Sequence, residues 1–530
     1  MKILIAEPLA PAGVKLLQEQ AGWDVVVSNP KEYAQHLADC DALLVRSAVK
    51  VNAEVLAKAP KLKVIGRAGV GVDNVDLPAA TAAGILVMNT PGGNSVSVAE
   101  HTFALMLALA RSIPQASAST KSGKWEKKKF LGNEVRGKTL GILGLGSIGR
   151  EVVRRAKAFE MRVLASDPYV SSQTATSLGI QLAGIDELYA ESDYISLHVA
   201  LTPETKSMLS TAAFEKMKTG VRIINCARGE LVDEKALKVA MDSGKVAGAA
   251  LDVFEKEPPV DDPILTVETL VATPHIGGST EEAQETVGIR IVEQLIEYLK
   301  NGVAINAVNI PALTAEQYRT VGPYVELADR LGSFAAHIAI GNPSRARLVY
   351  QGKIADQKTV LIRNAGVAGV LSRSTSVRTN TVNAMQLADD RGLTVAEVHE
   401  HRSDHTDSVR LELETDRGTV TVEGAVVLDQ PRLISVDGIY CEAPLAGHLV
   451  FLQNQDVPGV IGYVGSVLGK NGVNIATFSL GRRSAQGDAV SVIATDQSVS
   501  EAVLQELLKN PAVKRARTVE FLHAAETAKA

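Results

Sequence analysis

The sequence predicts an α/β protein with two doubly wound, Rossmann-like domains, followed by an α+β domain and a small ferredoxin-like domain. Three observations lead to this prediction. A βαβ alternation runs twice through the first 311 residues, a glycine-rich turn follows the first strand of the second run, and the pattern changes after Pro311. A chain of 530 residues is also too long for one hydrophobic core, so several domains are expected.

The first run of short apolar segments predicts a parallel sheet of buried strands. These strands are expected at residues 3–5, 25–27, 42–45, 64–65 and 85–87. The nearly all-apolar stretch 94–111 then predicts one long helix buried on most sides, which suits a junction between domains or subunits. A helix at 281–300, ended by Asn301 and Gly302, would carry the chain back. We therefore expect a discontinuous first domain at 1–93 and 282–311.

The second run predicts a complete dinucleotide-binding domain over residues 94–281. Its strands are expected at residues 139–143, 162–165, 194–197, 222–225, 248–251 and 270–272. After Pro311, β-rich stretches at 360–362, 409–413 and 419–422 indicate an α+β domain over 313–445. Residues 448–524 show a βαββαβ order, and the tail 524–530 is expected to be frayed.

A GxGxxG turn, formed by Gly144, Gly146 and Gly149, follows the strand at 139–143. A helix beginning there would present free backbone N–H groups, from residues such as Ser147 and Ile148, to a pyrophosphate. Gly146 would let the backbone come close to the phosphate, and Gly149 would let the helix pack on its strand. The pattern predicts a dinucleotide site.

Asp167 stands at the end of the next strand, about 20 residues beyond the glycines, where the dinucleotide fingerprint has an acid. A carboxylate there can accept both ribose hydroxyls of NAD and would repel the additional phosphate of NADP. Pro168 and Tyr169 follow it, and no arginine does. The sequence thus predicts NAD as the cofactor, with a solvated loop acid as the alternative interpretation of Asp167.

Three residues beyond the glycine turn form a candidate catalytic set. His275, just past a predicted strand, can exchange a proton with a carbonyl oxygen near neutral pH. Glu257 can orient that imidazole and stabilise its charged form, although a surface acid before prolines is the alternative. Arg228 can bind a carboxylate with its planar guanidinium. Strand ends of this kind are where ligands bind in open α/β sheets.

Bulk properties exclude several classes of protein. With a net charge of −5 and 46% hydrophobic residues, the chain has no basic excess for nucleic acid. Three widely spaced cysteines argue against a disulfide framework or a metal site. The longest apolar run, 102–110, is far short of the ~20 residues of a membrane span. Because the sequence enters a predicted strand at once, no targeting segment is expected, and a cytoplasmic location is predicted.

The motifs at 144–149, 225–229, 250–258 and 273–278 together resemble the D-isomer-specific 2-hydroxyacid dehydrogenases, over residues 1–311. The resemblance implies Arg228 as the substrate-carboxylate anchor, Glu257 as the histidine partner and His275 as the acid/base. It further implies a set of cofactor contacts in which Asp252 faces the nicotinamide carboxamide. The set comprises Gly144, Gly146, Ser147, Ile148, Gly149, Asp167, Cys226, Ala227, Asp252, Gly277 and Gly278.

Within that family, the motifs at 45–48, 66–76, 89–95 and 123–130 are most similar to the branch that oxidises 3-phospho-D-glycerate in the first step of L-serine synthesis. This similarity implies that Arg46, Arg67 and Asn94 bind the substrate, whose phosphate needs cations. In the alternative interpretation, the arginines tie the two domains together. The lysines at 127–129 form either a solvated turn or a contact toward a neighbouring subunit's site.

Residues 454–461 and 472–475 resemble an ACT domain, a small-molecule sensor that often pairs across subunits. Asn454, Asp456 and Asn474 fall at its effector positions, and L-serine is the effector that the resemblance implies. A purely dimerising domain is the alternative. A homotetramer is expected by the same analogy.

Two rival functions use the same motifs. A glyoxylate or hydroxypyruvate reductase would share the catalytic residues, but the long C-terminal extension argues against it. An NADH-sensing regulatory protein would not need Arg228, Glu257 and His275 all to be present, and here all three are.

Overall fold

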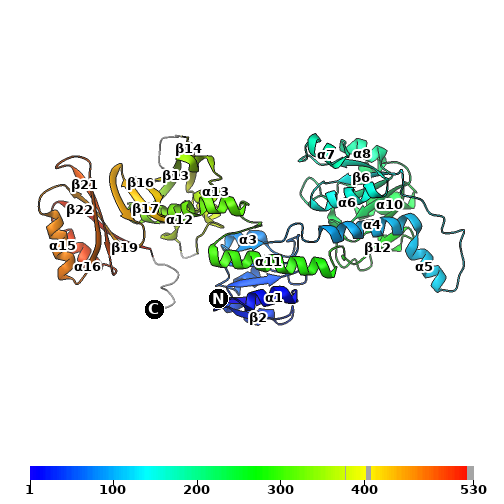
Figure 1. Cartoon of the computed structure of the whole chain (residues 1–530), viewed down its shortest axis with the longest axis horizontal. Helices are drawn as coiled ribbons and strands as arrows, with labels where there is room; N and C mark the ends of the chain where they lie inside the picture. Colours follow the sequence, from blue (N-terminus) through cyan, green and yellow to red (C-terminus); the bar gives the residue numbers. More distant parts are fainter. Residues whose placement is uncertain (376–377, 402–406, 522–530) are drawn as a thin grey trace.

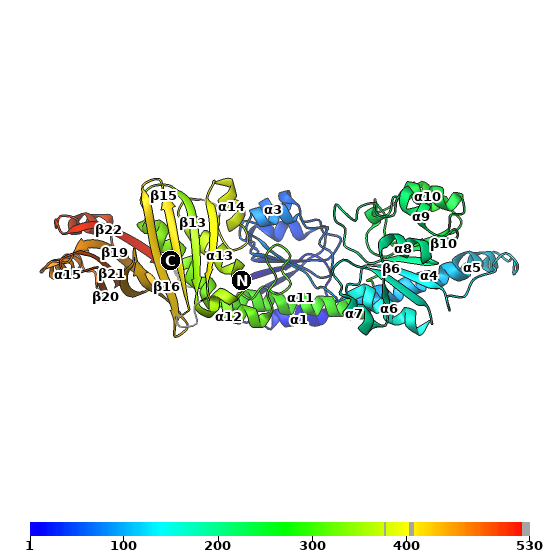
Figure 2. The same ribbon diagram turned by 90° about the horizontal axis from the view of Figure 1, so that it is seen from above.

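The computed structural model describes residues 1–375, 378–401 and 407–521. Four β-sheets follow one another along the long axis of the molecule (Figure 1). Along this axis the spatial order is second sheet, first sheet, third sheet and fourth sheet. The perpendicular view shows the same order (Figure 2). The tail expected at 524–530, and the predicted domain limit at 524, lie outside the described residues.

The first sheet has the order β2-β1-β3-β4-β5 with all strands parallel. The strands are β1 (Lys2–Ile5), β2 (Asp24–Val27), β3 (Ala42–Val45), β4 (Val64–Arg67) and β5 (Leu86–Met88). Its short helices are α1 (Pro11–Gln18), η1 (Tyr33–Asp39), α2 (Ala53–Ala57) and α3 (Leu77–Ala82). All five strands were predicted. The prediction that β2 is buried is wrong, because β2 is an edge strand and Val27 is 56% exposed.

The second sheet is also parallel, in the order β12-β11-β10-β9-β6-β7-β8. Its strands are β6 (Thr139–Leu143), β7 (Arg162–Ser166), β8 (Gln181–Leu182), β9 (Tyr194–Leu197), β10 (Val221–Asn225), β11 (Val246–Leu251) and β12 (Leu270–Ala272). The helices between them are α6 (Ser147–Ala158), α7 (Ser172–Leu178), α8 (Ile185–Glu191), α9 (Thr211–Lys216) and α10 (Glu234–Asp242). The six predicted strands are confirmed, and only the two-residue edge strand β8 was missed.

Two long helices connect these sheets. The chain enters the second sheet through α4 (Ser95–Arg111), which packs on α6 and β11, and α5 (Ile113–Lys121) follows. It returns through α11 (Glu281–Asn301), which packs on α1 and β4 and ends at Gly302 in the left-handed conformation. In the described part of the chain, no single helix is long and apolar enough to cross a bilayer. Helices α4 and α5 meet that criterion only as a pair bent by 63°.

The third sheet is mixed, with the order β14-β13-β15-β16-β17-β18, and helix α12 lies against it. Its strands are β13 (Pro343–Gln351), β14 (Thr394–Glu400), β15 (Ser408–Thr415), β16 (Gly418–Val427), β17 (Gln430–Val436) and β18 (Ile439–Pro444). Its helices are α12 (Ala315–Ile338), α13 (Val360–Ser372) and α14 (Ala384–Asp390).

The strand predicted at 360–362 is wrong, because these residues begin helix α13. The helix is buried nearly all round, so its sequence lacks the polar face that would have indicated a helical period. Small residues also let it pack closely on α12: a Cβ at Gly369 would lie 2.1 Å from the Asp329 carbonyl oxygen. A β-branched start alone could not distinguish such a helix from a buried strand.

The fourth sheet is antiparallel, in the order β20-β21-β19-β22, and carries two helices. Its elements are β19 (Gly447–Gln455), α15 (Val460–Lys470), β20 (Ile475–Arg482), β21 (Asp488–Thr495), α16 (Glu501–Leu507) and β22 (Val513–Phe521). The predicted βαββαβ order is confirmed. The four sheets together also confirm the predicted α/β fold class.

Candidate active site

The glycine turn between β6 and α6 leaves open space at the helix N-terminus. Gly144 has a φ of 93°, which glycine adopts without strain. A Cβ at Gly149 would lie 2.1 Å from the Gly144 carbonyl oxygen, so the helix packs tightly on the strand there. Gly146, by contrast, has no atom within 4 Å of such a Cβ. The turn thus offers Ser147 and Ile148, at the start of α6, to a phosphate.

Asp167 lies next to this turn, at the end of β7. Its Oδ2 accepts a hydrogen bond from the Leu145 N–H (2.7 Å), and its Oδ1 accepts one from the Tyr169 N–H (2.8 Å). The carboxylate is therefore held at the edge of the glycine turn, beside the space left open at Gly146. This is where a ribose would follow a pyrophosphate bound at the helix N-terminus.

His275 and Glu257 form a direct pair after β12 and β11. The His275 Nδ1 lies 2.8 Å from Glu257 Oε2, and the two side chains are 51% and 39% exposed. Glu257 Oε1 in turn accepts from the Phe254 N–H. His275 has a φ of 54°, an uncommon conformation for a residue with a side chain. Because Glu257 occupies Nδ1, Nε2 is the ring nitrogen that can face a substrate.

Asp252 is 1% exposed and holds the turn that carries His275. Its Oδ1 accepts from Thr273 Oγ1 (2.6 Å) and the Ile276 N–H (2.9 Å), and its Oδ2 accepts from the Gly277 N–H (2.8 Å). His101, on α4, lies 3.3 Å from Oδ1. Burial raises the pKa of Asp252, but hydrogen bonds from His101, Thr273 and the two N–H groups outweigh it and leave that pKa lowered.

His101 and Thr273 were missed by the sequence analysis. His101 stands with Glu100 and Thr102 as a short polar group in a helix that is otherwise mostly apolar, which is a signal that could have marked it. Its Nε2 also lies 3.1 Å from Thr273 Oγ1. The structure therefore shows Asp252 as the centre of a network, with both carboxylate oxygens engaged, in addition to the cofactor contact that was predicted for it.

Arg228 reaches from the turn after β10 to the first sheet. Its Nη2 and Nε lie 2.8 and 3.1 Å from Asp73 Oδ2, and its Nη1 donates to the Ala227 carbonyl oxygen. The turn itself is closed by Asn225, whose amide donates to the Arg228 carbonyl oxygen and accepts from the Ala227 N–H. Cys226 is buried, and burial raises the pKa of its thiol to about 12.

Arg67 and Arg46 lie near Arg228 on the side of the first sheet. Burial lowers the pKa of Arg67, and the positive charges of Arg228 and Arg46 add to that effect. Arg67 Nε is buried and has no hydrogen-bond partner among the described residues. Arg46 follows β3 and donates weakly to the Pro8 carbonyl oxygen at 3.5 Å. The structure thus brings three predicted cations to one region between the two sheets.

Asn94 precedes α4 and faces the turn after His275. A Cβ at Gly278 would lie 2.8 Å from the Asn94 amide nitrogen. The Asn94 Oδ1 is buried without a hydrogen-bond partner in the described part of the chain. An orphaned acceptor here, together with the open helix N-terminus at Gly146, fits a site that completes its hydrogen bonds with a ligand.

The three predicted effector residues are not brought together within one chain. Asn454 is 1% exposed, near the end of β19, and its amide donates to the Gln455 carbonyl oxygen. Asp456 pairs with Arg482 at 2.8 Å, and that hydrogen bond lowers the pKa of Asp456. Asn474 donates to Asp496 (2.7 Å) at the other end of the sheet, where β20 begins.

Comparison with protein families finds three matches along the chain. The D-isomer specific 2-hydroxyacid dehydrogenase NAD-binding domain matches residues 103–277. The D-3-phosphoglycerate dehydrogenase intervening domain matches residues 320–437, and the ACT domain matches residues 448–512. The three matched regions correspond to the second, third and fourth sheets.

Curated relatives extend this similarity to nearly the whole chain. The D-3-phosphoglycerate dehydrogenase of Methanocaldococcus jannaschii is 42% identical over 97% of this chain and 98% of its own length. The D-3-phosphoglycerate dehydrogenase of Bacillus subtilis is 38% identical over 98% of this chain and 99% of its own length. Among solved structures, the TT0316 protein of Thermus thermophilus (36% identity, TM-score 0.54) covers 58% of this chain and is itself covered completely. The Aquifex aeolicus D-lactate dehydrogenase solved with NAD and lactic acid has 30% identity and a TM-score of 0.52, over 59% of this chain and all of its own.

Proposed function

The chain belongs to the D-isomer specific 2-hydroxyacid dehydrogenases, in their D-3-phosphoglycerate dehydrogenase branch, and we propose that it oxidises 3-phospho-D-glycerate to 3-phosphohydroxypyruvate. This is the first step of L-serine synthesis. The observation that carries the proposal is the His275–Glu257 pair, at 2.8 Å, which follows strands of the second sheet, whereas Arg46 and Arg67 lie at strand ends of the first sheet. The arrangement combines a proton acceptor with cations suited to a phosphorylated acid.

The cofactor is NAD. When bound, NAD supplies the acceptor for the hydride that leaves C2 of the substrate. We assign its pyrophosphate to the backbone of Gly146, Ser147 and Ile148, and its ribose to Asp167. We assign the remaining predicted contacts, from the turns at 226–227 and 277–278, to the same cofactor.

His275 takes the hydroxyl proton of the substrate through Nε2. Glu257 stabilises the imidazolium that results, because its carboxylate lies on Nδ1. Arg228 holds the substrate carboxylate with the remaining N–H groups of Nη1 and Nη2, which Asp73 and the Ala227 carbonyl leave free. In the reverse direction, His275 returns the proton to the carbonyl oxygen.

Arg46 and Arg67 would bind the phosphate. The unpartnered Nε of Arg67, and the absence of an ion pair to Arg46 among the described residues, support this role. The alternative, in which these arginines only tie the domains together, requires a carboxylate partner on the side of the second sheet. Among the described residues, the one ion pair between the two sides that involves an arginine near the site joins Arg228 and Asp73.

Oxidation of NADH by the purified protein, with 3-phosphohydroxypyruvate and with hydroxypyruvate, glyoxylate and 2-oxoglutarate in parallel, tests the proposal. We expect a kcat/KM for the phosphorylated substrate at least about tenfold above that for the others, since a phosphate adds charge-assisted hydrogen bonds. A preference for hydroxypyruvate or glyoxylate would assign the chain to the reductases. NADH binding without turnover on any 2-oxoacid would favour a regulatory protein.

We propose an oligomer in which fourth sheets pair, with a homotetramer as the expected size. The ends of the sheet are too far apart for Asn454 and Asn474 to meet in one chain, so an L-serine site built from both needs a second copy. A dimerising role without an effector is the alternative. Calorimetric titration with L-serine, combined with measurement of the oligomer mass, distinguishes the two.

We propose a cytoplasmic location because of the state of the cysteine thiols. Cys40, Cys226 and Cys441 are free and buried, which suits a reducing compartment.

A further inference from the structure

Glu7 is a buried acid, 5% exposed, that follows β1 in the first sheet. It makes three hydrogen bonds, and each donor is a backbone N–H of the turn after β3. Oε1 accepts from the N–H groups of Arg46 and Val49, both at 2.9 Å. Oε2 accepts from the Ala48 N–H at 3.0 Å. A buried carboxylate is stable only when its oxygens are satisfied in this way.

Asn74 holds the same turn from the opposite side. Its amide nitrogen donates to the carbonyl oxygens of Arg46 (2.9 Å) and Val49 (2.7 Å). Glu7 therefore satisfies the N–H groups of the turn, and Asn74 satisfies its carbonyl groups. Five hydrogen bonds from two side chains fix the backbone from which the Arg46 side chain projects.

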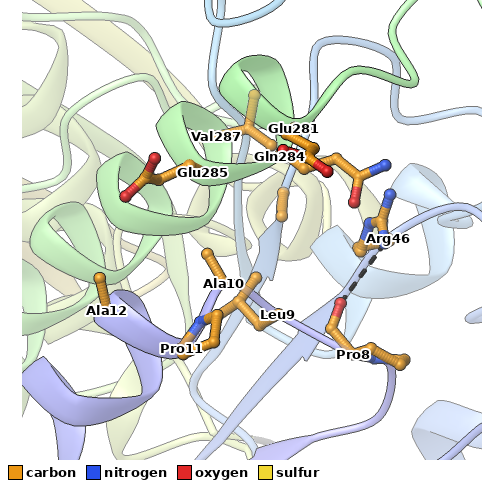
Figure 3. A pocket seen from close by; sticks show the side chains of 11 residues that line it. Pro8, Leu9, Ala10, Pro11, Ala12, Arg46, Glu281, Gln284, Glu285 and Val287 are labelled. Atoms are coloured by element: carbon orange, nitrogen blue, oxygen red, sulfur yellow. Dashed lines mark hydrogen bonds between the residues drawn. The ribbon is translucent and has the colours of Figure 1, made fainter.

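The guanidinium of Arg46 remains open to a ligand. It lines a cavity of about 330 Å³ between the segment Pro8–Ala12 and the first turns of α11 (Figure 3). Among the described residues, the guanidinium makes a single hydrogen bond, to the Pro8 carbonyl oxygen, and that bond is long at 3.5 Å. No carboxylate forms an ion pair with it among the described residues. The backbone of Arg46 is thus firmly held, while its charged end is not.

We propose that Glu7 and Asn74 are positioning residues for Arg46, and that they set the enzyme's preference for a phosphorylated substrate over an unphosphorylated one. The inference rests on the proposed function, in which Arg46 binds the phosphate. Neither residue touches substrate. Each acts through the turn, because an arginine whose Cα is displaced by 1 Å loses the bidentate geometry that a phosphate requires.

Glu7→Gln tests the first of the two residues. An amide has one acceptor oxygen, so its NH2 group would face the backbone N–H of the turn and displace it. We expect kcat/KM for 3-phosphohydroxypyruvate to fall about tenfold or more, since hydrogen bonds to a charged group are lost. The value for hydroxypyruvate should change less than about twofold, and the KM for NADH should not change.

Asn74→Ala should reduce the ratio of kcat/KM for 3-phosphohydroxypyruvate to kcat/KM for hydroxypyruvate, because it removes the hydrogen bonds to the carbonyl groups of the turn. This variant also provides a test if Glu7→Gln does not fold. Glu54→Gln is the matched control. Glu54 is an exposed glutamate on α2, paired with Lys58 at the surface, and its variant should keep the wild-type ratio.

The Arg46→Ala background gives the most specific measurement. If Glu7 acts through Arg46, then Glu7→Gln lowers the ratio no further once Arg46 is absent. Independent, multiplying effects would overturn the inference, and so would equal losses on both substrates, which indicate a merely structural role. If the wild type itself shows no preference for the phosphorylated substrate, the proposed function fails. If it shows the preference and both variants retain it, the inference alone fails.

Discussion

Two buried carboxylates, Asp252 beside the second sheet and Glu7 beside the first, each hold a turn that carries a functional side chain. Asp252 follows β11 of the second sheet and holds the turn that carries His275. Glu7 follows β1 of the first sheet and holds the turn that carries Arg46. In both places a strand-end acid binds backbone N–H groups of a neighbouring loop and so places a functional side chain.

The two carboxylates differ in what else they contact. Asp252 also binds Thr273 and lies beside His101 of the long helix α4, so it is part of a side-chain network. Within the part of the chain that the structure describes, Glu7 accepts hydrogen bonds only from backbone groups. The difference indicates that a change at Asp252 should affect the reacting histidine and hence every substrate. A change at Glu7 should affect only recognition of the phosphate.

The largest expected effect comes from removing the reacting group itself. His275→Ala should lower kcat about 10²- to 10⁴-fold on all 2-oxoacid substrates, because the proton donor is lost. NADH affinity, measured by fluorescence titration, should hold. Turnover that stays at the wild-type level would show that His275 is not the acid/base, and that the turn held by Asp252 does not position a catalytic residue.

Asp252→Asn should have the next largest effect on activity. An amide cannot accept from Thr273 and the backbone N–H groups on both sides, so the turn should loosen. We expect kcat to fall about tenfold to a hundredfold for phosphorylated and unphosphorylated substrates alike. Asp242→Asn, at an exposed site on α10, serves as the control. A loss confined to the phosphorylated substrate would contradict the division of roles.

Asp167→Ala should leave intact the turns that carry His275 and Arg46, and it should change the preference between NAD and NADP. The ratio of kcat/KM with NADH to that with NADPH should fall about tenfold, because a charge that repels the additional phosphate is removed. Steady-state kinetics with the two cofactors gives the ratio directly. If it does not move, Asp167 is a structural acid that holds Leu145 and Tyr169.

Glu257→Gln should have the smallest effect at neutral pH. The glutamate stabilises the charged imidazolium, so its neutral replacement should narrow the pH range of reductive activity on the alkaline side. A pH profile of kcat/KM from pH 6 to about 9.5 covers the relevant range. Superimposable profiles for variant and wild type would show that Glu257 only supports the loop through Phe254.

Local patterns in the sequence predicted most of the fold and the residues that carry chemistry. The glycines of the turn at 144–149 and the strand-end positions of Arg228 and His275 are each indicated by the few residues around them. The structure has them on the loops that follow β6, β10 and β12 of the parallel second sheet. The strand predicted at 360–362 failed because a helix buried on all sides shows no polar face.

What the sequence could not predict depends on contacts between distant segments. Glu7 lies 39 residues from Arg46, and His101 contacts Asp252 and Thr273 across the sheet. Nothing in the spacing of these residues indicates that they meet. The same limit applies to Asn454 and Asn474, which resemble effector positions but lie at opposite ends of one sheet.

The most direct test of the two-carboxylate account is a side-by-side measurement of Asp252→Asn and Glu7→Gln. For each, the ratio of kcat/KM for 3-phosphohydroxypyruvate to that for hydroxypyruvate is compared with the wild-type ratio. The account predicts an unchanged ratio for Asp252→Asn, with both values reduced, and a ratio lowered about tenfold for Glu7→Gln. The same change of ratio in both variants would contradict it.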